Sequence, residues 1–86
     1  MYYHTILRQS PEFENRMPLS DGEVIRQGKR FHTLNITATE ILDLFDGSRS
    51  VGEVIDTMGS RYPEQKRGQV IEAFILQLYD AGLLVE

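Results

Sequence analysis

The sequence of 86 residues contains no cysteine, which excludes disulfides, thiolate zinc sites, iron–sulfur clusters and cysteine nucleophiles. No apolar run approaches the ~18 residues that a membrane-spanning helix needs. The first residues lack the charged and then apolar pattern of a signal peptide. These absences predict one small cytoplasmic domain, whose 41% hydrophobic content suffices for a core without a disulfide or a metal.

Residue groups that could carry out catalysis are also missing. The only histidines are His4 and His32, and no spacing in the sequence places a serine or a carboxylate beside either. His32 lies in a candidate strand, which favours an ordinary solvent-facing or hydrogen-bonded side chain. No glycine-rich phosphate loop, Walker pattern or metal-ligand spacing occurs. The sequence therefore predicts a protein that is not an enzyme and needs no cofactor or metal.

Positive charge is scarce in the second half of the chain. The net charge is −4, and residues 36–86 hold four Lys or Arg against nine Asp or Glu. Nucleic-acid binding draws most of its affinity from phosphate neutralisation, so this balance argues against it. A winged-helix nucleic-acid-binding protein nevertheless stays open as the alternative. Arg61, Lys66 and Arg67 stand where a recognition helix would begin, and a gel shift at low salt would decide.

Three short segments near the N-terminus have the composition of β-strands. The candidate strands are 13–19, 23–27 and 30–34. Asp21-Gly22 is a strong hairpin signal, and Gly28-Lys29 predicts a second tight turn. We therefore expect a three-stranded antiparallel meander whose first and third strands are edges. Residues 1–10 precede it as an N-terminal arm, expected to be frayed or loosely docked, with a contact to a partner as the alternative.

Three helices are expected after the meander. In the first, Thr37 and Glu40 have the spacing of a capping box, and Asp46-Gly47 is the stop signal. The second begins with the same spacing at Ser50 and Glu53, after a linker at 48–50. Pro63 breaks the chain before a third helix over 64–81, which Gly82 ends. The predicted fold class is α+β and winged-helix-like, with the sheet before the helices.

The third helix has more apolar surface than one core needs. Ala73, Leu76 and Leu83 fall outside the broad apolar face and could form a second stripe. The third strand is a predicted edge with only Lys29 and Arg30 as charged guards. If the two lie side by side, they would bind an extended peptide by strand addition. The alternatives are that the strand or the C-terminal tail covers the stripe, or that the edge pairs with a second copy.

Two ordered motifs resemble the PqqD-like family. They read Leu34-Asn35-x-Thr37-Ala38-x-x-Ile41-Leu42 and Asp46-Gly47-x-Arg49-x-Val51-x-x-Val54. Arg8-x-Ser10-Pro11-x-Phe13 before the first strand, Tyr62, and the closing Leu78-x-x-x-Gly82-Leu83-Leu84 are also similar to that family. The resemblance covers residues 8–86, and it makes 11–86 the expected PqqD-like peptide-binding domain.

The resemblance implies a RiPP recognition element. Such domains bind the leader of a ribosomally made precursor peptide and present it to a modifying enzyme, often a radical SAM enzyme. The implied leader strand pairs with the third strand against the third helix. The residues implied on the strand are Arg30, Phe31, His32, Thr33 and Leu34, and those on the helix side are Ala73, Leu76, Gln77, Asp80 and Leu83.

The chain departs from this family before the third strand. Members that serve pyrroloquinoline quinone synthesis usually have a proline and an acidic residue there, whereas this chain has Gly28-Lys29-Arg30. Another peptide pathway therefore stays open. We also hypothesise that Arg26, Lys29 and Arg30 attract an acidic leader and raise its association rate more than its final affinity. The alternative is a solvated hairpin tip that guards against aggregation.

Overall fold

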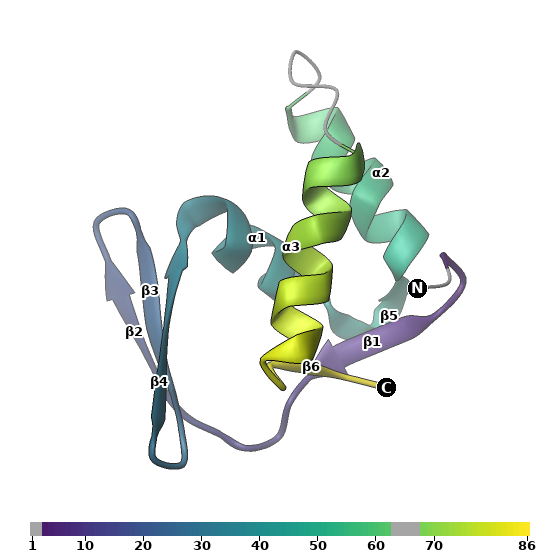
Figure 1. Cartoon of the computed structure of the whole chain (residues 1–86). Helices are drawn as coiled ribbons and strands as arrows, with labels where there is room; N and C mark the ends of the chain where they lie inside the picture. Colours follow the sequence, from purple (N-terminus) through teal and green to yellow (C-terminus); the bar gives the residue numbers. More distant parts are fainter. Residues whose placement is uncertain (1–2, 63–67) are drawn as a thin grey trace.

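The computed structural model describes residues 3–62 and 68–86 (Figure 1). Its elements are β1 Ile6–Gln9, β2 Phe13–Leu19, β3 Gly22–Gln27, β4 Arg30–Asn35, α1 Ile36–Leu44, β5 Asp46–Ser50, α2 Val51–Arg61, α3 Gly68–Asp80 and β6 Leu84–Val85. The strands form two antiparallel sheets, of order β2-β3-β4 and β5-β1-β6. The predicted α+β class is confirmed.

The meander forms from the three predicted strands. Gln27 pairs with Arg30, so Gly28-Lys29 is the predicted two-residue turn between β3 and β4. Ile25 pairs with His32 on β4, which places these two side chains on the same face of the sheet. Ile25 is fully buried, so this face is the inner one. It follows that alternate residues of β4 face the protein interior and the others face solvent.

The first turn lies one residue earlier than predicted. Leu19 pairs with Gly22, so the two turn residues are Ser20 and Asp21 rather than Asp21 and Gly22. Gly22 opens β3 with φ of 152°, and a Cβ atom there would lie 1.8 Å from the carbonyl oxygen of Leu34. The close approach of β4 therefore requires this glycine, in addition to its backbone conformation.

The second sheet joins three segments that are far apart in the sequence. β1 pairs with β5 on one side and with β6 on the other. Leu7 in the middle of β1 is 1% exposed and belongs to the core. The expectation of a loosely docked arm is therefore wrong for residues 6–9, and the expected linker at 48–50 is part of β5. Strands this short carry too little periodicity to be recognised in a sequence.

The segment before β1 is fastened to the start of α2. The N–H groups of Val51 and Gly52 donate to the carbonyl oxygens of Thr5 and Tyr3, both at 2.8 Å. These N–H groups belong to the first turn of α2, where no partner within the helix exists. The N-terminal segment thus supplies acceptors that the helix itself lacks.

Helix α1 begins two residues earlier than the sequence predicts. Its N-cap is Asn35, whose Oδ1 accepts from the N–H of Ala38 at 2.8 Å, so the predicted Thr37 cap is wrong. Asparagine is the better N-cap residue, and it comes first along the chain. Glu40 makes no capping box but accepts from the hydroxyl of Tyr62 at 2.8 and 2.9 Å. That bond ties α1 to the end of α2.

The predicted cap of α2 is confirmed. Ser50 Oγ accepts from the N–H of Glu53 at 3.2 Å, and Glu53 Oε1 accepts from the N–H of Ser50 at 3.0 Å. Before it, α1 ends at Leu44, and the predicted stop at Asp46-Gly47 begins β5, with φ of 89° at the glycine.

The third helix is seen over Gly68–Asp80. The predicted start at Glu64 and the break at Pro63 lie outside the described residues. At the other end, Gly82 has φ of 79° and the N–H of Leu83 donates to the carbonyl of Leu78 at 2.9 Å. This left-handed glycine ends the helix as predicted and returns the chain to β6.

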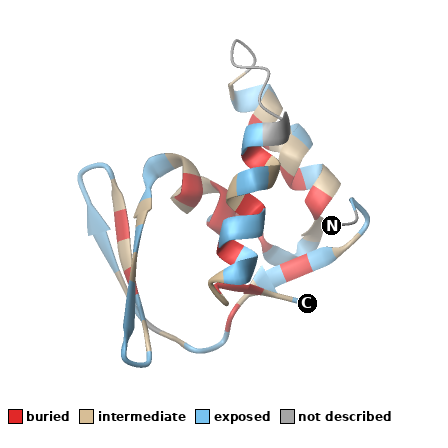
Figure 2. Cartoon of the chain, in the orientation of Figure 1, coloured by how far each residue is buried: buried red, intermediate tan, exposed pale blue. Residues whose placement is uncertain are grey.

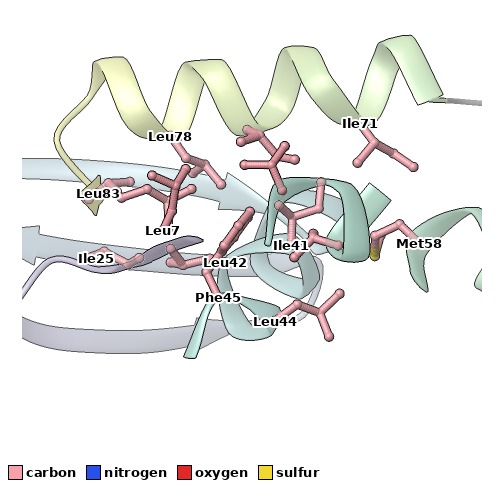
Figure 3. Close-up of a cluster of buried hydrophobic side chains, with 14 residues drawn as sticks. Leu7, Ile25, Ile41, Leu42, Leu44, Phe45, Met58, Ile71, Leu78 and Leu83 are labelled. Carbon is pink, nitrogen blue, oxygen red and sulfur yellow. The ribbon is translucent and has the colours of Figure 1, made fainter. Parts of the chain in front are cut away.

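One hydrophobic core lies where α1, α2, α3 and β1 meet (Figure 3). Its largest fully buried side chain is Phe45, and Ile25 is the meander's contribution. Exposed positions predominate on β2 and β4, which lie to one side of the helices (Figure 2). In the described part of the chain, no helix is long and apolar enough to cross a membrane.

A polar network at Arg16 ties the meander to the rest of the domain. Its guanidinium binds the buried Glu23 through two bonds of 2.6 and 3.0 Å. The same group donates to Asp43 of α1 at 2.7 Å and to Gln9 of β1 at 3.2 Å. Because these partners come from three other elements, Arg16 fixes how β2 and β3 sit against α1 and β1.

Candidate functional site

The strand β4 has a free edge. It pairs with β3 on one side, and no described strand pairs with it on the other. His32 and Leu34 face inward and are half-buried, whereas Phe31 and Thr33 face outward and are exposed. Phe31 is 70% exposed. An edge of this kind presents backbone N–H and C=O groups on which another strand can pair.

The helix α3 presents three different faces. Ile71, Ile75 and Leu78 are buried in the core. At 100° per residue, Phe74, Gln77 and Ala81 lie together on one flank of this buried stripe. The opposite flank carries Glu72 and Tyr79, and Leu76 projects away from the core at 39% exposure. Glu72 beside the Tyr3 hydroxyl raises the pKa of that tyrosine, which places this second flank near the N-terminal segment.

The first flank of α3 and the free edge of β4 enclose a hollow of about 430 Å³. We call this hollow the groove. Its lining residues are Phe31, His32, Thr33, Leu34, Asn35, Ala38, Phe74, Gln77, Leu78, Ala81 and Leu83. The volume falls in the range of about 300–1,000 Å³ that is typical of ligand sites. The predicted juxtaposition of the third strand and third helix is thus present in the structure.

Two further hollows adjoin the groove along α3. One of about 300 Å³ is lined by Val70, Ala73, Phe74 and Gln77, and shares the last two residues with the groove. The other, of about 750 Å³, includes Arg30 and shares Ala81 with the groove. We call it the lower hollow, after its place at the β3–β4 turn. The three together follow α3 along its described length.

The predicted site residues separate into two sets. Lining the groove or the hollows beside it are Arg30, Phe31, His32, Thr33, Leu34, Ala73, Gln77 and Leu83. Leu76 and Asp80 line none of the three, since their positions on the helix turn them away from β4. Leu83 is only 1% exposed, so it is a core residue beneath the groove and not an exposed stripe residue. The proposed stripe of Ala73, Leu76 and Leu83 is therefore wrong.

Asn35, Ala38 and Leu78 line the groove without having been predicted as site residues. The same is true of Phe74 and Ala81. Both fall on the apolar side of the helical wheel, which led to their interpretation as core. In the structure they are half-buried and pack beside the core while also facing β4. Phe74 and Ala81 are seven residues apart, so they lie on one line along the helix. This spacing is the sequence pattern that could have indicated a shared surface.

Both ends of the groove are held by specific bonds. At one end the Gln27 side-chain amide donates to the Gly82 carbonyl at 2.9 Å and to Ser10 Oγ at 3.5 Å. At the other end β4 runs directly into α1 through the Asn35 cap. The separation of β4 from α3 is therefore set by the protein before any ligand arrives.

The groove contains one polar group without a partner. The Nε2 atom of His32 is buried and has no hydrogen-bond partner among the described residues. A buried polar atom of this kind is unfavourable unless something pairs with it.

Positive charge gathers at the turn between β3 and β4. Arg26, Lys29 and Arg30 are all exposed there, and the Arg26 Nε donates to the carbonyl of Gly28 at 3.3 Å. On the helical side, Arg61 is held 3.6 Å from Glu40, while Lys66 and Arg67 lie outside the described residues. Across 3–62 and 68–86, no group of three or more acidic or histidine residues could hold a metal ion.

The fold is that of a small α+β domain in which an open sheet edge faces a helix. An open sheet edge of this kind is a structure to which extended peptides bind by strand addition. The family model described as "Coenzyme PQQ synthesis protein D (PqqD)" matches residues 21–84, so this chain belongs to the PqqD family. The match includes β3, β4 and all three described helices. Members of this family are non-catalytic accessory proteins that bind precursor peptides. No curated protein and no solved structure matches the chain.

Proposed function

We propose that this protein binds the leader of a ribosomally made precursor peptide in the groove and presents it to a modifying enzyme of the radical SAM type. The observation that supports this most directly is the free edge of β4, which faces the flank of α3 that carries Phe74, Gln77 and Ala81. The leader pairs with β4 as an additional strand, and its backbone groups use the donors and acceptors of that edge.

Selectivity comes from alternate side chains of the leader. Those that point inward meet Phe74 and Ala81 on α3. Those that point outward extend the exposed face beside Phe31 and Thr33. At about 3.3 Å per residue, the six residues of β4 can pair with a segment of similar length.

We further propose that the turn between β3 and β4 steers an acidic leader toward the groove. Reversing the charges of Lys29 and Arg30 together would lower the association rate and flatten its dependence on salt. Stopped-flow association of a labelled leader at two salt concentrations measures both. An unchanged rate and an unchanged salt slope would leave the turn as a solvated tip without this role.

The main test is an NMR titration. The probe is a synthetic peptide with the leader sequence of the precursor encoded beside the gene of this protein. Shifts are expected at residues 31–35 of β4 and at Phe74, Gln77 and Ala81. Shifts confined to other parts of the protein would refute the groove as the site.

A pair of variants on α3 sharpens this test. Gln77→Trp places an indole over the groove and should weaken leader binding at least about tenfold, a change of ~1.4 kcal/mol. Leu76→Trp is the matched control, because the same side chain then projects from the helix away from β4. Equal affinities of the two variants would contradict the proposed position of the peptide.

A second copy of the chain is a competing occupant of the same edge. A homodimer formed through β4 would bury the groove, so leader binding and dimerisation would exclude each other. Sedimentation of the protein with increasing leader peptide tests this, because a competing dimer dissociates as the leader binds. The proposed cytoplasmic location follows from the same pathway, since ribosomally made precursors are released there.

A further inference from the structure

The lower hollow lies just beyond the end of the edge that β4 offers. Its lining residues are Ser10, Pro11, Glu12, Phe13, Gln27, Gly28, Arg30, Ala81, Gly82 and Val85. They come from the β1–β2 connection, the β3–β4 turn and the end of α3, and they enclose about 750 Å³. Ala81 lines both this hollow and the groove, so the two adjoin each other at this residue of the chain.

The geometry of β4 determines how a paired peptide must leave. β4 begins at Arg30, and the chain turns away at Gly28-Lys29, so no backbone edge continues past that point. Every strand pair in the described sheets is antiparallel, and an antiparallel peptide on β4 runs from Asn35 toward Arg30. The residues that follow the paired segment therefore enter the space in front of the lower hollow.

We propose that the lower hollow is a second binding subsite, which takes an acidic side chain and an adjacent apolar side chain of the segment that follows the paired strand. This inference rests on the proposed function of the groove. Arg30 would bind the acidic side chain. Phe13, Ala81 and Val85 supply half-buried apolar surface for its neighbour.

Charge in and around the lower hollow agrees with this assignment. Arg30 and Glu12 are the charged residues of its lining. Arg26 and Lys29 are exposed on the same turn as Arg30, so positive charge gathers at this turn of the sheet. Glu12 lies on the other wall, in the β1–β2 connection, where its backbone N–H donates to Ser10 Oγ at 3.2 Å. A carboxylate of the peptide is therefore favoured on the Arg30 side.

A peptide series tests the subsite. The first peptide is the leader segment that pairs with β4 alone, and three more extend it at the C-terminus by Glu-Leu, Gln-Leu or Lys-Leu. The Glu-Leu peptide should bind about fivefold more tightly than the Gln-Leu peptide, with Lys-Leu the weakest. In Arg30→Gln protein, this preference for Glu over Gln should disappear.

Spin labels give a second readout that does not depend on affinity. A nitroxide at the C-terminus of the bound Glu-Leu peptide should broaden the amide signals of Gly28 and Gly82. A nitroxide at its N-terminus should broaden those of Val70 and Ala73 instead. Neither broadening effect should remain once the nitroxide is reduced.

The outcomes separate the two proposals. If the extensions bind no more tightly than the unextended peptide, or if the C-terminal label broadens Val70 and not Gly82, the subsite is refuted while groove binding stands. If the unextended peptide shifts neither β4 nor α3, the proposed function itself fails.

Discussion

The sheet β2-β3-β4 and the sheet β5-β1-β6 are both three-stranded and antiparallel, but they are assembled differently. The first is a continuous stretch of chain joined by two-residue turns, and it contributes mainly Ile25 to the core. The second brings together residues 6–9, 46–50 and 84–85, with Leu7 buried at its centre. The local sheet offers a free edge for a ligand, and the non-local sheet holds the helices against which that edge is positioned.

The two sheets thus divide two tasks within a very small domain. A sheet made of hairpins forms from local contacts and can keep one edge open, because its turns hold it together. A sheet made of distant segments closes the chain on itself and joins the common core. Substitutions in the non-local sheet should therefore affect stability most, and those in the meander should affect the groove.

The largest effect is expected in β1. Leu7→Ala should lower the free energy of unfolding by about 3 kcal/mol, because it removes a fully buried side chain and leaves a cavity. The matched control is Ile6→Ala in the same strand, where the side chain is 50% exposed and the loss should be below about 1 kcal/mol. Urea denaturation measures both. Similar losses at the two positions would show that β1 is not part of the core.

The next effect is expected inside the meander. Gly22→Ala should lower the free energy of unfolding by about 2 kcal/mol, since its Cβ meets the Leu34 carbonyl and its φ is unfavourable for alanine. Gly28→Ala has nothing within 4 Å of the added Cβ, so only its φ of 62° opposes the change, and about 1 kcal/mol is expected. If Gly22→Ala were the milder variant, the close approach of β3 and β4 would be refuted.

A smaller effect is expected where the two sheets are joined. Arg16→Met removes the partner of the buried Glu23 and should lower the free energy of unfolding by about 1–2 kcal/mol. Adding Glu23→Gln should restore part of that loss, because the remaining side chain is no longer a buried charge. Chemical denaturation of both variants tests this. A double variant less stable than Arg16→Met alone would contradict the network.

The smallest effect depends on pH and concerns the junction of β5 and α2. The hydrogen bond from the Ser50 N–H lowers the pKa of Glu53 below its ordinary value of 4.5, and bonds from Ser48 likewise lower the pKa of Asp46 below 3.8. A lowered folded-state pKa gives stabilisation that is present above the ordinary value and lost as pH falls through the folded one.

Glu53→Gln should therefore be slightly less stable than the natural protein at pH 7, and equally stable at acid pH below the folded pKa. The amide oxygen still accepts from Ser50, so the capping geometry is kept. Unfolding at several pH values measures the difference, and Asp46→Asn provides an independent comparison. A stability difference that grows on acidification would contradict a lowered pKa of Glu53.

The predictable parts of this fold are those that depend on neighbours in the chain. The strands of the meander, the Gly28-Lys29 turn and the Ser50–Glu53 cap all follow from residues within a few positions of one another. Errors arose where two local signals competed. Asn35 and Thr37 both suit an N-cap. Asn35 is the N-cap in the structure because β4 ends at this residue and α1 begins at the next one.

For the site, the sequence correctly indicated a free β4 edge with the third helix beside it, but not which helix residues face that edge. A helical wheel gives the angle between side chains, and it does not say which direction meets the core. Phe74 and Ala81 lie on the boundary between core and groove, whereas Leu76 projects from the far side of the helix. Which face of α3 meets the core and which faces β4 is decided by the elements that pack against this helix, and these are known only from the tertiary structure.

The sequence by itself determined the α+β class, the meander, and an open edge on its third strand, because turn and cap chemistry act over a few residues. The tertiary structure alone decided the sheet β5-β1-β6, the Arg16 network and the width of the groove. Those features join segments far apart in the chain, including a two-residue strand, and their pairing energies exist only once the whole domain is folded.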